Sequence, residues 1–400
     1  MKLAINGGNP AISEIIDDWK DIQKDDINCV SKYLEENELS VINGGILNEF
    51  EEKFAKFIGT KYAVAYCNGT VALHAASYAC GANKESTFIL SEYSYHGTVN
   101  SVLENSSKVV LCDYDKKTLN IDLDSAERLI DKNTKGIIIT HCWGNPVDMD
   151  KIEKLRSKYN LKIISDASHA HGAMWNGKNI GSLECEDIAC FSLGKNKLIS
   201  AGELGIAVTN DPNLYDKLLF FGHPNRVPEA LITKKYIDYA NGIGNKYRPH
   251  PLSMVLAIQQ LNRYSKKKEL NIKTNKFLVN EINKIPGFKP IESYSKSDRV
   301  FWKLLIRANN EYWEGIKFDK IVEALKAEGI KLEQFHNYNI SAHEHIWKHE
   351  RYMNLLENKS VISTPEDILV MPGYIDVNKK QLEEIVEAFK KISEYKEELR

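Results

Sequence analysis

The most informative stretches of the sequence are SDASHAHG at residues 165–172, FSLGKNK at 191–197 and GELG at 202–205. The first two stretches come directly after short apolar runs, so that Asp166 and a later lysine stand at the ends of expected strands. In open α/β sheets, ligands bind at the carboxyl ends of the strands. The pattern therefore predicts a sheet that presents a carboxylate and an amine to one ligand.

Outside these stretches, short apolar runs alternate with helical patterns from about residue 60 to 211. Such alternation predicts a largely parallel sheet with helices on both faces. The expected strands lie at 62–66, 87–90, 109–111, 137–139, 163–164, 189–191 and 206–208.

After residue 250 the pattern changes to a long helix, a strand and two further helices. We therefore predict a large domain over residues 1–250 and a smaller C-terminal α/β domain over residues 251–400. The expected elements of the second domain are a helix at 252–282, a strand at 300–306, a helix at 319–328 and a final helix around 382–392.

Composition and charge favour small-molecule chemistry. With 53 Lys and Arg against 55 Asp and Glu, the net charge of −2 gives no basis for binding nucleic acid. No apolar run has the length of a signal-peptide core or a membrane span, so we expect a cytoplasmic protein without a membrane partner. The seven cysteines form no CxxC pair, and His343, His345 and His349 form no HExxH motif, so we expect no metal site.

Several residues match the groups that hold pyridoxal 5'-phosphate (PLP). Gly69 and Thr70 follow an expected strand and open a helix, where backbone amides and a hydroxyl can bind a phosphate. Asp166 can keep the pyridine nitrogen protonated, and His169 can reach the ring or its phenolic oxygen. A turn or a helix cap would also explain Gly69, Thr70 and Asp166.

The aldehyde of this cofactor requires a primary amine whose pKa can fall. Lys195 and Lys197 both qualify, and their spacing does not separate them. Tyr95 follows the strand that ends near Leu90, and we expect its ring to stack on the cofactor.

These residues together resemble the DegT/DnrJ/EryC1/StrS family of PLP-dependent aminotransferases, which act on keto sugars or cyclitols. The likeness extends from residues 3–8 to the last helix. The family pattern of Phe-Ser, four residues, Lys and then Gly-Glu-x-Gly falls on 191–197 and 202–205. The resemblance thus selects Lys197 as the Schiff-base lysine, and as the base that moves a proton during amino transfer.

The resemblance also implies further cofactor contacts. Ser192 looks like a phosphate ligand, and Asn68 stands where the family's phosphate loop usually has Ser. Lys246, in the segment Gly244-Asn245-Lys246-Tyr247-Arg248, stands where Asn is common and where the family reaches the phosphate of the neighbouring subunit. The resemblance therefore implies a homodimer with active sites at the subunit interface.

The fold implied by the resemblance is of the aspartate-aminotransferase type, fold type I, with a mixed, mostly parallel seven-stranded sheet in the large domain. The implied reaction is ping-pong transfer of an amino group from L-glutamate or L-glutamine to a keto sugar, often nucleotide-linked, or a keto cyclitol. Three alternatives are an aminotransferase for a small phosphorylated ketone, a dehydrating or aromatising lyase on the same cofactor, and a PLP-binding regulatory protein.

Overall fold

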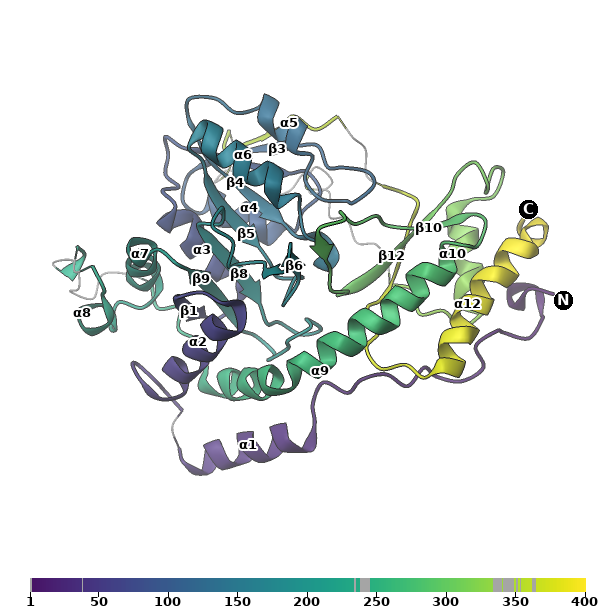
Figure 1. Cartoon of the computed structure of the whole chain (residues 1–400), viewed down its shortest axis with the longest axis horizontal. Helices are drawn as coiled ribbons and strands as arrows, with labels where there is room; N and C mark the ends of the chain where they lie inside the picture. The colour runs from purple at the N-terminus through teal and green to yellow at the C-terminus, as the bar shows by residue number, and fades with distance from the viewer. Residues whose placement is uncertain are drawn as a thin grey trace.

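The structure is a computed structural model in which a large α/β body and a smaller C-terminal part are joined by one long helix (Figure 1). It describes residues 2–37, 39–233, 235–237, 245–333, 340, 349, 352, 354–361 and 365–400.

The large body is built on an eight-stranded sheet with the order β1-β9-β8-β5-β4-β2-β3-β13. Strand β9 runs antiparallel to both of its neighbours, and the other neighbouring pairs are parallel. The strands are β1 Tyr62–Tyr66, β2 Thr87–Ser91, β3 Lys108–Cys112, β4 Thr134–Thr140, β5 Lys162–Asp166, β8 Ile188–Ser192, β9 Gly205–Thr209 and β13 Leu356–Asn358. Every strand expected from the sequence in this body is confirmed.

The helices of the described residues cover both faces of this sheet and build the C-terminal part. They are α1 Lys24–Glu35, α2 Gly45–Ile58, α3 Gly69–Ala79, α4 His96–Leu103, α5 Leu123–Arg128, α6 Met149–Tyr159, α7 Pro212–Gly222, α8 Val227–Ala230, α9 Pro251–Ile282, α10 Phe318–Ala327 and α12 Lys379–Glu394. None of them combines the length and the apolar character that a bilayer crossing requires.

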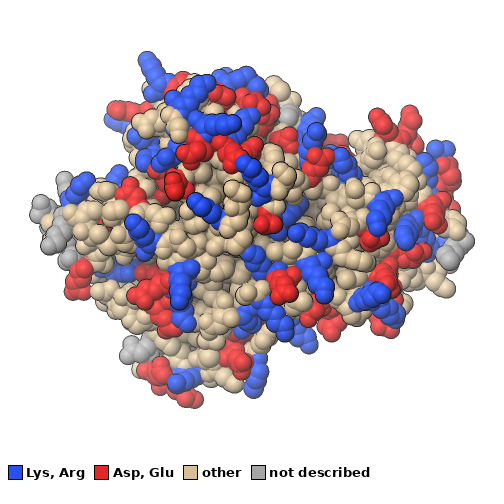
Figure 2. Space-filling model, viewed as in Figure 1, with Lys and Arg blue, Asp and Glu red and all other residues tan. Residues whose placement is uncertain are grey.

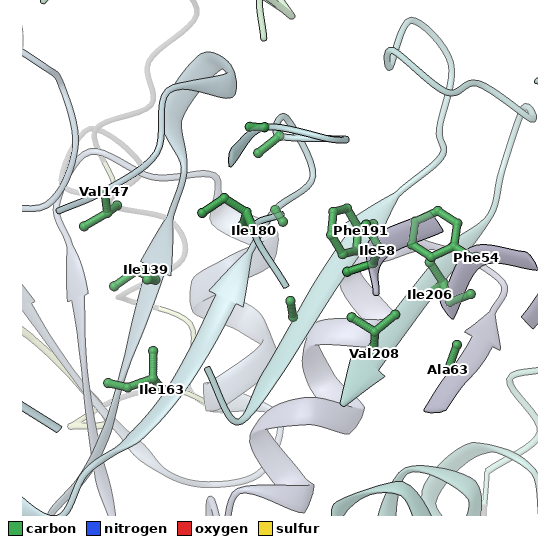
Figure 3. Packing of buried hydrophobic residues seen from close by; sticks show 14 of the residues in the cluster. Phe54, Ile58, Ala63, Ile139, Val147, Ile163, Ile180, Phe191, Ile206 and Val208 are labelled. Carbon is green, nitrogen blue, oxygen red and sulfur yellow. The ribbon is translucent and has the colours of Figure 1, made fainter. Parts of the chain in front are cut away.

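The apolar runs of the strands are buried on two sides. In β4, Ile137 and Ile139 pack toward helices α2, α5 and α6, whereas Ile138 between them packs toward α3, α4 and α7. Figure 3 shows the first of these cores, where Phe54 of α2 lies beside Phe191 of β8 with ring centroids 5.2 Å apart. Burial on both faces explains why these strands are continuous apolar runs in the sequence.

A second core fills the C-terminal part. It lies between α10, α12 and the antiparallel sheet β10-β12-β14, formed by Phe288–Pro290, Lys303–Ala308 and Ile368–Pro372. Leu3 and Ile12 from the start of the chain are buried in this core. Helix α9 contributes Met254 to the first core and Leu278 to the second, so one helix stabilises both. The boundary at residue 250 stays a prediction.

The sheet of the large body has one strand more than the seven that we expected. Strand β13 pairs in parallel with β3, and it comes from a segment that follows the C-terminal strand β12 in the chain. Only Leu356 in it is apolar, so no apolar run marks it in the sequence. On the face seen in Figure 2, basic and acidic side chains are interspersed.

Candidate active site

A cavity of about 420 Å³ opens at the carboxyl ends of strands β5 and β8. Eight of the nine residues predicted to bind the cofactor line it, and they come from four separate segments of the chain. These eight are Asn68, Gly69, Thr70, Tyr95, Asp166, His169, Ser192 and Lys197. The fold therefore brings together residues that the sequence only placed at strand ends.

The first turn of α3 supplies donors for an anion. The side chain of Asn68 caps the helix by accepting a hydrogen bond from the Val71 N–H at 2.9 Å. The N–H groups of Gly69 and Thr70, in the same turn, have no acceptor among the described residues. Free amides at a helix N-terminus favour a phosphate.

Gly69 lies against strand β8. A Cβ atom at Gly69 would lie 2.6 Å from the Cβ of Ser192, which is closer than real Cβ contacts come. The absence of a side chain at Gly69 thus lets the helix start beside the Ser192 hydroxyl. A hydroxyl and free amides at one end of the cavity fit a phosphate group.

Asp166 forms the acidic end of the cavity and is only 4% exposed. One carboxylate oxygen accepts a hydrogen bond from the Thr98 hydroxyl at 2.7 Å, and the other accepts one from the Ser168 N–H at 3.2 Å. No salt bridge joins it to a lysine, arginine or histidine in the part of the chain that the structure describes. A buried carboxylate of this kind fits a cationic group such as a pyridinium.

Lys197 is half-buried in the turn after β8. Burial of its amine lowers the pKa from 10.5 to about 8, Asp166 opposes this fall, and Lys303 adds to it. The amine lies 3.8 Å from the ring centroid of Trp302. A lysine with a lowered pKa is a nucleophile near neutral pH, as an aldehyde requires.

His169 is a neutral hydrogen-bonding group. Burial lowers its pKa well below 6.5, and the nearby Lys197 lowers it further. Its Nδ1 accepts a hydrogen bond from the Trp143 N–H at 3.3 Å, so the proton of the neutral ring is on Nε2. His169 thus carries a donor that can serve an oxygen atom of a ligand.

Tyr95 stands directly before α4 and is 46% exposed on the cavity wall. Partial burial raises its pKa, so the phenol stays neutral. A Cβ at Gly97 would lie 2.8 Å from both the Tyr95 ring and the Thr70 hydroxyl, so Gly97 allows those two groups to approach each other. The stacking role of Tyr95 stays a prediction.

Sequence reasoning assigned no specific contact to three residues at this site. Trp302 lines the cavity from the C-terminal part of the chain, and its ring stacks on His169 with centroids 3.8 Å apart. Thr98 binds Asp166, and Trp143 binds His169 with a left-handed backbone at φ 60°. No motif marks Trp302 or Trp143, whereas Thr98 comes shortly after the expected strand at 87–90.

Lys246 does not line the cavity of its own chain. Its segment is held beside β1, because the Cys67 N–H donates to the Tyr247 carbonyl at 2.9 Å. Lys246 is exposed there, and Gly244 at the start of the motif lies outside the described residues. The contact of Lys246 with a neighbouring subunit stays a prediction.

No group of three His, Cys, Asp or Glu side chains is arranged as metal ligands among the described residues. His343 and His345 lie outside them.

The sequence of this chain is similar to those of known aminotransferases. The DegT/DnrJ/EryC1/StrS aminotransferase family matches residues 20–390. The putative L-glutamine:3-amino-2,3-dideoxy-scyllo-inosose aminotransferase of Micromonospora echinospora is 28% identical over 337 residues, covering 83% of this chain and 79% of the relative. GDP-perosamine synthase of Caulobacter vibrioides is 31% identical over 301 residues, covering 74% and 78%.

Among solved structures, the aminotransferase from Psychrobacter cryohalolentis is similar with a TM-score of 0.82 at 22% identity, covering 94% of this chain and 98% of that one. This likeness confirms the α/β fold of the aspartate-aminotransferase type. Because the family pattern spans nearly the whole sequence, the chain belongs to the DegT/DnrJ/EryC1/StrS aminotransferase family, and the protein is an aminotransferase.

Proposed function

We propose that this protein uses pyridoxal 5'-phosphate to move an amino group from L-glutamate or L-glutamine to a keto sugar, often nucleotide-linked, or a keto cyclitol, by a ping-pong route. The observation that carries the proposal is Lys197, an amine with a pKa of about 8 in the same cavity as the buried Asp166. When bound, the cofactor supplies an aldehyde that accepts the amino group of the donor, stores it and returns it to the ketone.

The residues of the cavity fit this group at both ends. The N–H groups of Gly69 and Thr70, with the Ser192 hydroxyl, would hold the phosphate. Asp166 would hold the ring nitrogen in its protonated form, and the Nε2–H of His169 would donate to the phenolic oxygen.

Lys197 would have two tasks. Its neutral amine would bind the aldehyde carbon, and, once displaced by the donor, it would take the proton from the donor's α-carbon. A pKa of about 8 gives a useful fraction of neutral amine at neutral pH and still allows protonation. Lys195 is exposed in the same loop, so the half-buried Lys197 is the better candidate.

The acceptor class rests on the relatives. The names of the two relatives described above refer to a cyclitol aminotransferase and to synthesis of a GDP-linked amino sugar. A keto cyclitol or a nucleotide-linked keto sugar is therefore our proposal for the acceptor. Neither of these names refers to a small phosphorylated ketone, which is the alternative acceptor. The alternative reaction is that of a dehydrating lyase, which would release a product that has lost water.

The test is the visible absorption of the protein reconstituted with PLP, recorded before and after excess L-glutamate and then L-glutamine. We expect the band of the lysine-bound cofactor to fall and the near-ultraviolet band of the amine form to rise. A band that neither donor changes would contradict amino transfer from these donors. Mass spectrometry of the product from each ketone then separates amino transfer from loss of water.

We also propose that the enzyme is a homodimer whose subunits share their sites through Lys246, which is exposed and outside its own cavity. Mixing Lys197→Ala and Lys246→Ala subunits tests this. A hybrid dimer would contain one site with both lysines intact, so activity should appear on mixing. No gain in activity, or a monomer in light scattering, would contradict the proposal.

A further inference from the structure

Trp302 contacts the candidate site in three places although it belongs to the C-terminal part of the chain. Its ring lies 3.8 Å from the Lys197 amine, it stacks on His169, and its Nε1–H donates to the Asn196 carbonyl at 2.7 Å. Asn196 has a left-handed backbone at φ 69°, directly before Lys197. One side chain thus binds both the lysine and the turn that carries it.

Burial of the Lys197 amine lowers its pKa more than the nearby charges raise it. Asp166 is the carboxylate that favours the ammonium form. Lys303 of β12 opposes it, although the Lys303 ammonium is paired with Glu333 at 2.5 Å. The other titratable groups that face this region are His169, His171, Lys195 and Glu203. Both histidines have lowered pKa values and stay neutral, so they add no negative charge.

We propose that Trp302 is a positioning residue that receives the amine of Lys197 whenever that amine is not bound to the cofactor. An aromatic face attracts an ammonium group more strongly than the neutral amine. The ring would therefore hold the protonated lysine beside the cavity and release it as the proton leaves. This role of Trp302 rests on the proposed function, because amino transfer frees the Lys197 amine in every catalytic cycle.

Competitive labelling of the cofactor-free protein tests the contact itself. An acylating reagent reacts only with neutral amines, and peptide mass spectrometry then gives the pH midpoint of Lys197. In Trp302→Leu, which keeps apolar bulk without a ring face, the ratio of ammonium to amine at Lys197 should fall about two- to tenfold. In Trp302→Phe, which keeps the ring face but loses the bond to Asn196, the ratio should stay near that of the unchanged protein.

Lys195 is the internal control, because it is exposed and lies two residues before Lys197 in the same loop. Its labelling should be the same in all three proteins. A Lys197 midpoint that is unchanged or raised in Trp302→Leu would overturn the proposal, as would equal shifts in the Leu and Phe variants. Should the Leu variant fail to fold, Trp302→Met replaces it as the ring-free variant.

This result is independent of turnover. If the proposed function failed, the amino donors would leave the cofactor spectrum unchanged, yet labelling would still report whether the ring holds the amine.

Discussion

Among single residues, Lys197 and Lys195 have the same primary amine but lie in different surroundings. Burial lowers the pKa of Lys197 to about 8, whereas Lys195 is exposed. We expect Lys197→Ala to lose amino transfer by about 10²–10⁴-fold, because Lys195, the other lysine that lines the cavity, is exposed, whereas Lys197 is half-buried. Lys195→Gln is the matched variant.

Turnover with L-glutamate and a keto sugar acceptor measures both variants. Lys195→Gln should keep most of the activity. Full activity in Lys197→Ala, or equal losses in the two variants, would exclude Lys197 as the catalytic lysine.

The titration of Lys197 should control how fast the cofactor attaches. Only the neutral amine attacks an aldehyde, so the rate of attachment should rise with pH and level off above about 8, the pKa of Lys197. In Asp166→Asn the carboxylate that raises this pKa is gone, and the rise should move to lower pH. Stopped-flow absorbance after mixing the cofactor-free protein with PLP measures the rate; a rate that falls with pH would contradict this assignment.

Residues that lie inside recognisable motifs could be predicted. Residues that contact the site from other parts of the sequence could not. Asp166 and Lys197 follow apolar strands in a recognisable pattern, so their place at one edge of a sheet was predictable. Trp302 is separated from them by more than a hundred residues, and Trp143 acts through its backbone N–H. Neither contact produces a periodic pattern or a motif that could be recognised in the sequence.

At the scale of elements, the start of helix α3 combines a cap with a ligand site. Asn68 caps the helix through its side chain, which leaves the next two amides free. We expect Asn68→Ala to lower the free energy of unfolding by about 1 kcal/mol, whereas Asn68→Ser should lose little because Ser also caps helices. Denaturant unfolding of both variants measures the difference.

The affinity for PLP of the Asn68→Ala and Asn68→Ser variants provides a second test. Asn68→Ser should bind PLP nearly as well as the unchanged protein, since a capped first turn keeps its amides aligned. An Ala variant as stable as the Ser variant would show that the cap contributes nothing.

Elements with two buried faces were predicted well. The strands of the large sheet alternate between two apolar cores, so each appears as a continuous apolar run. Strand β13 pairs with β3 at the edge and has one apolar residue in three, so backbone pairing rather than side-chain pattern specifies it. That pairing could not be read from the sequence.

At the scale of the whole molecule, helix α9 joins the two cores, and Asn271 fixes it to the C-terminal part. Its amide donates to the carbonyls of Phe301, Gly373 and Tyr374, and its oxygen accepts from the Phe301 N–H. We expect Asn271→Leu to lower the free energy of unfolding by about 3 kcal/mol, because a buried N–H and buried carbonyls lose their partners.

Denaturant unfolding measures this loss, and the exposed Lys273→Ala on the same helix is the control, expected to stay within about 0.5 kcal/mol. Equal stability of the Asn271 and Lys273 variants would show that this network does not hold α9 in place. Because Asn271 contacts the segment that precedes β12, its loss should also weaken the site through Trp302.

The order in which a ribosome makes this chain has a consequence for the edge of the large sheet. Strand β3 leaves the ribosome early, but its outer neighbour β13 is made only at residues 356–358. Leu3 and Ile12 likewise cannot be fully buried until α12, which begins at Lys379 and completes their core, has been made. A newly made chain therefore carries an unpaired strand edge and exposed apolar side chains until β13 and α12 have been made, and chaperones that shield such surfaces should bind it in that interval.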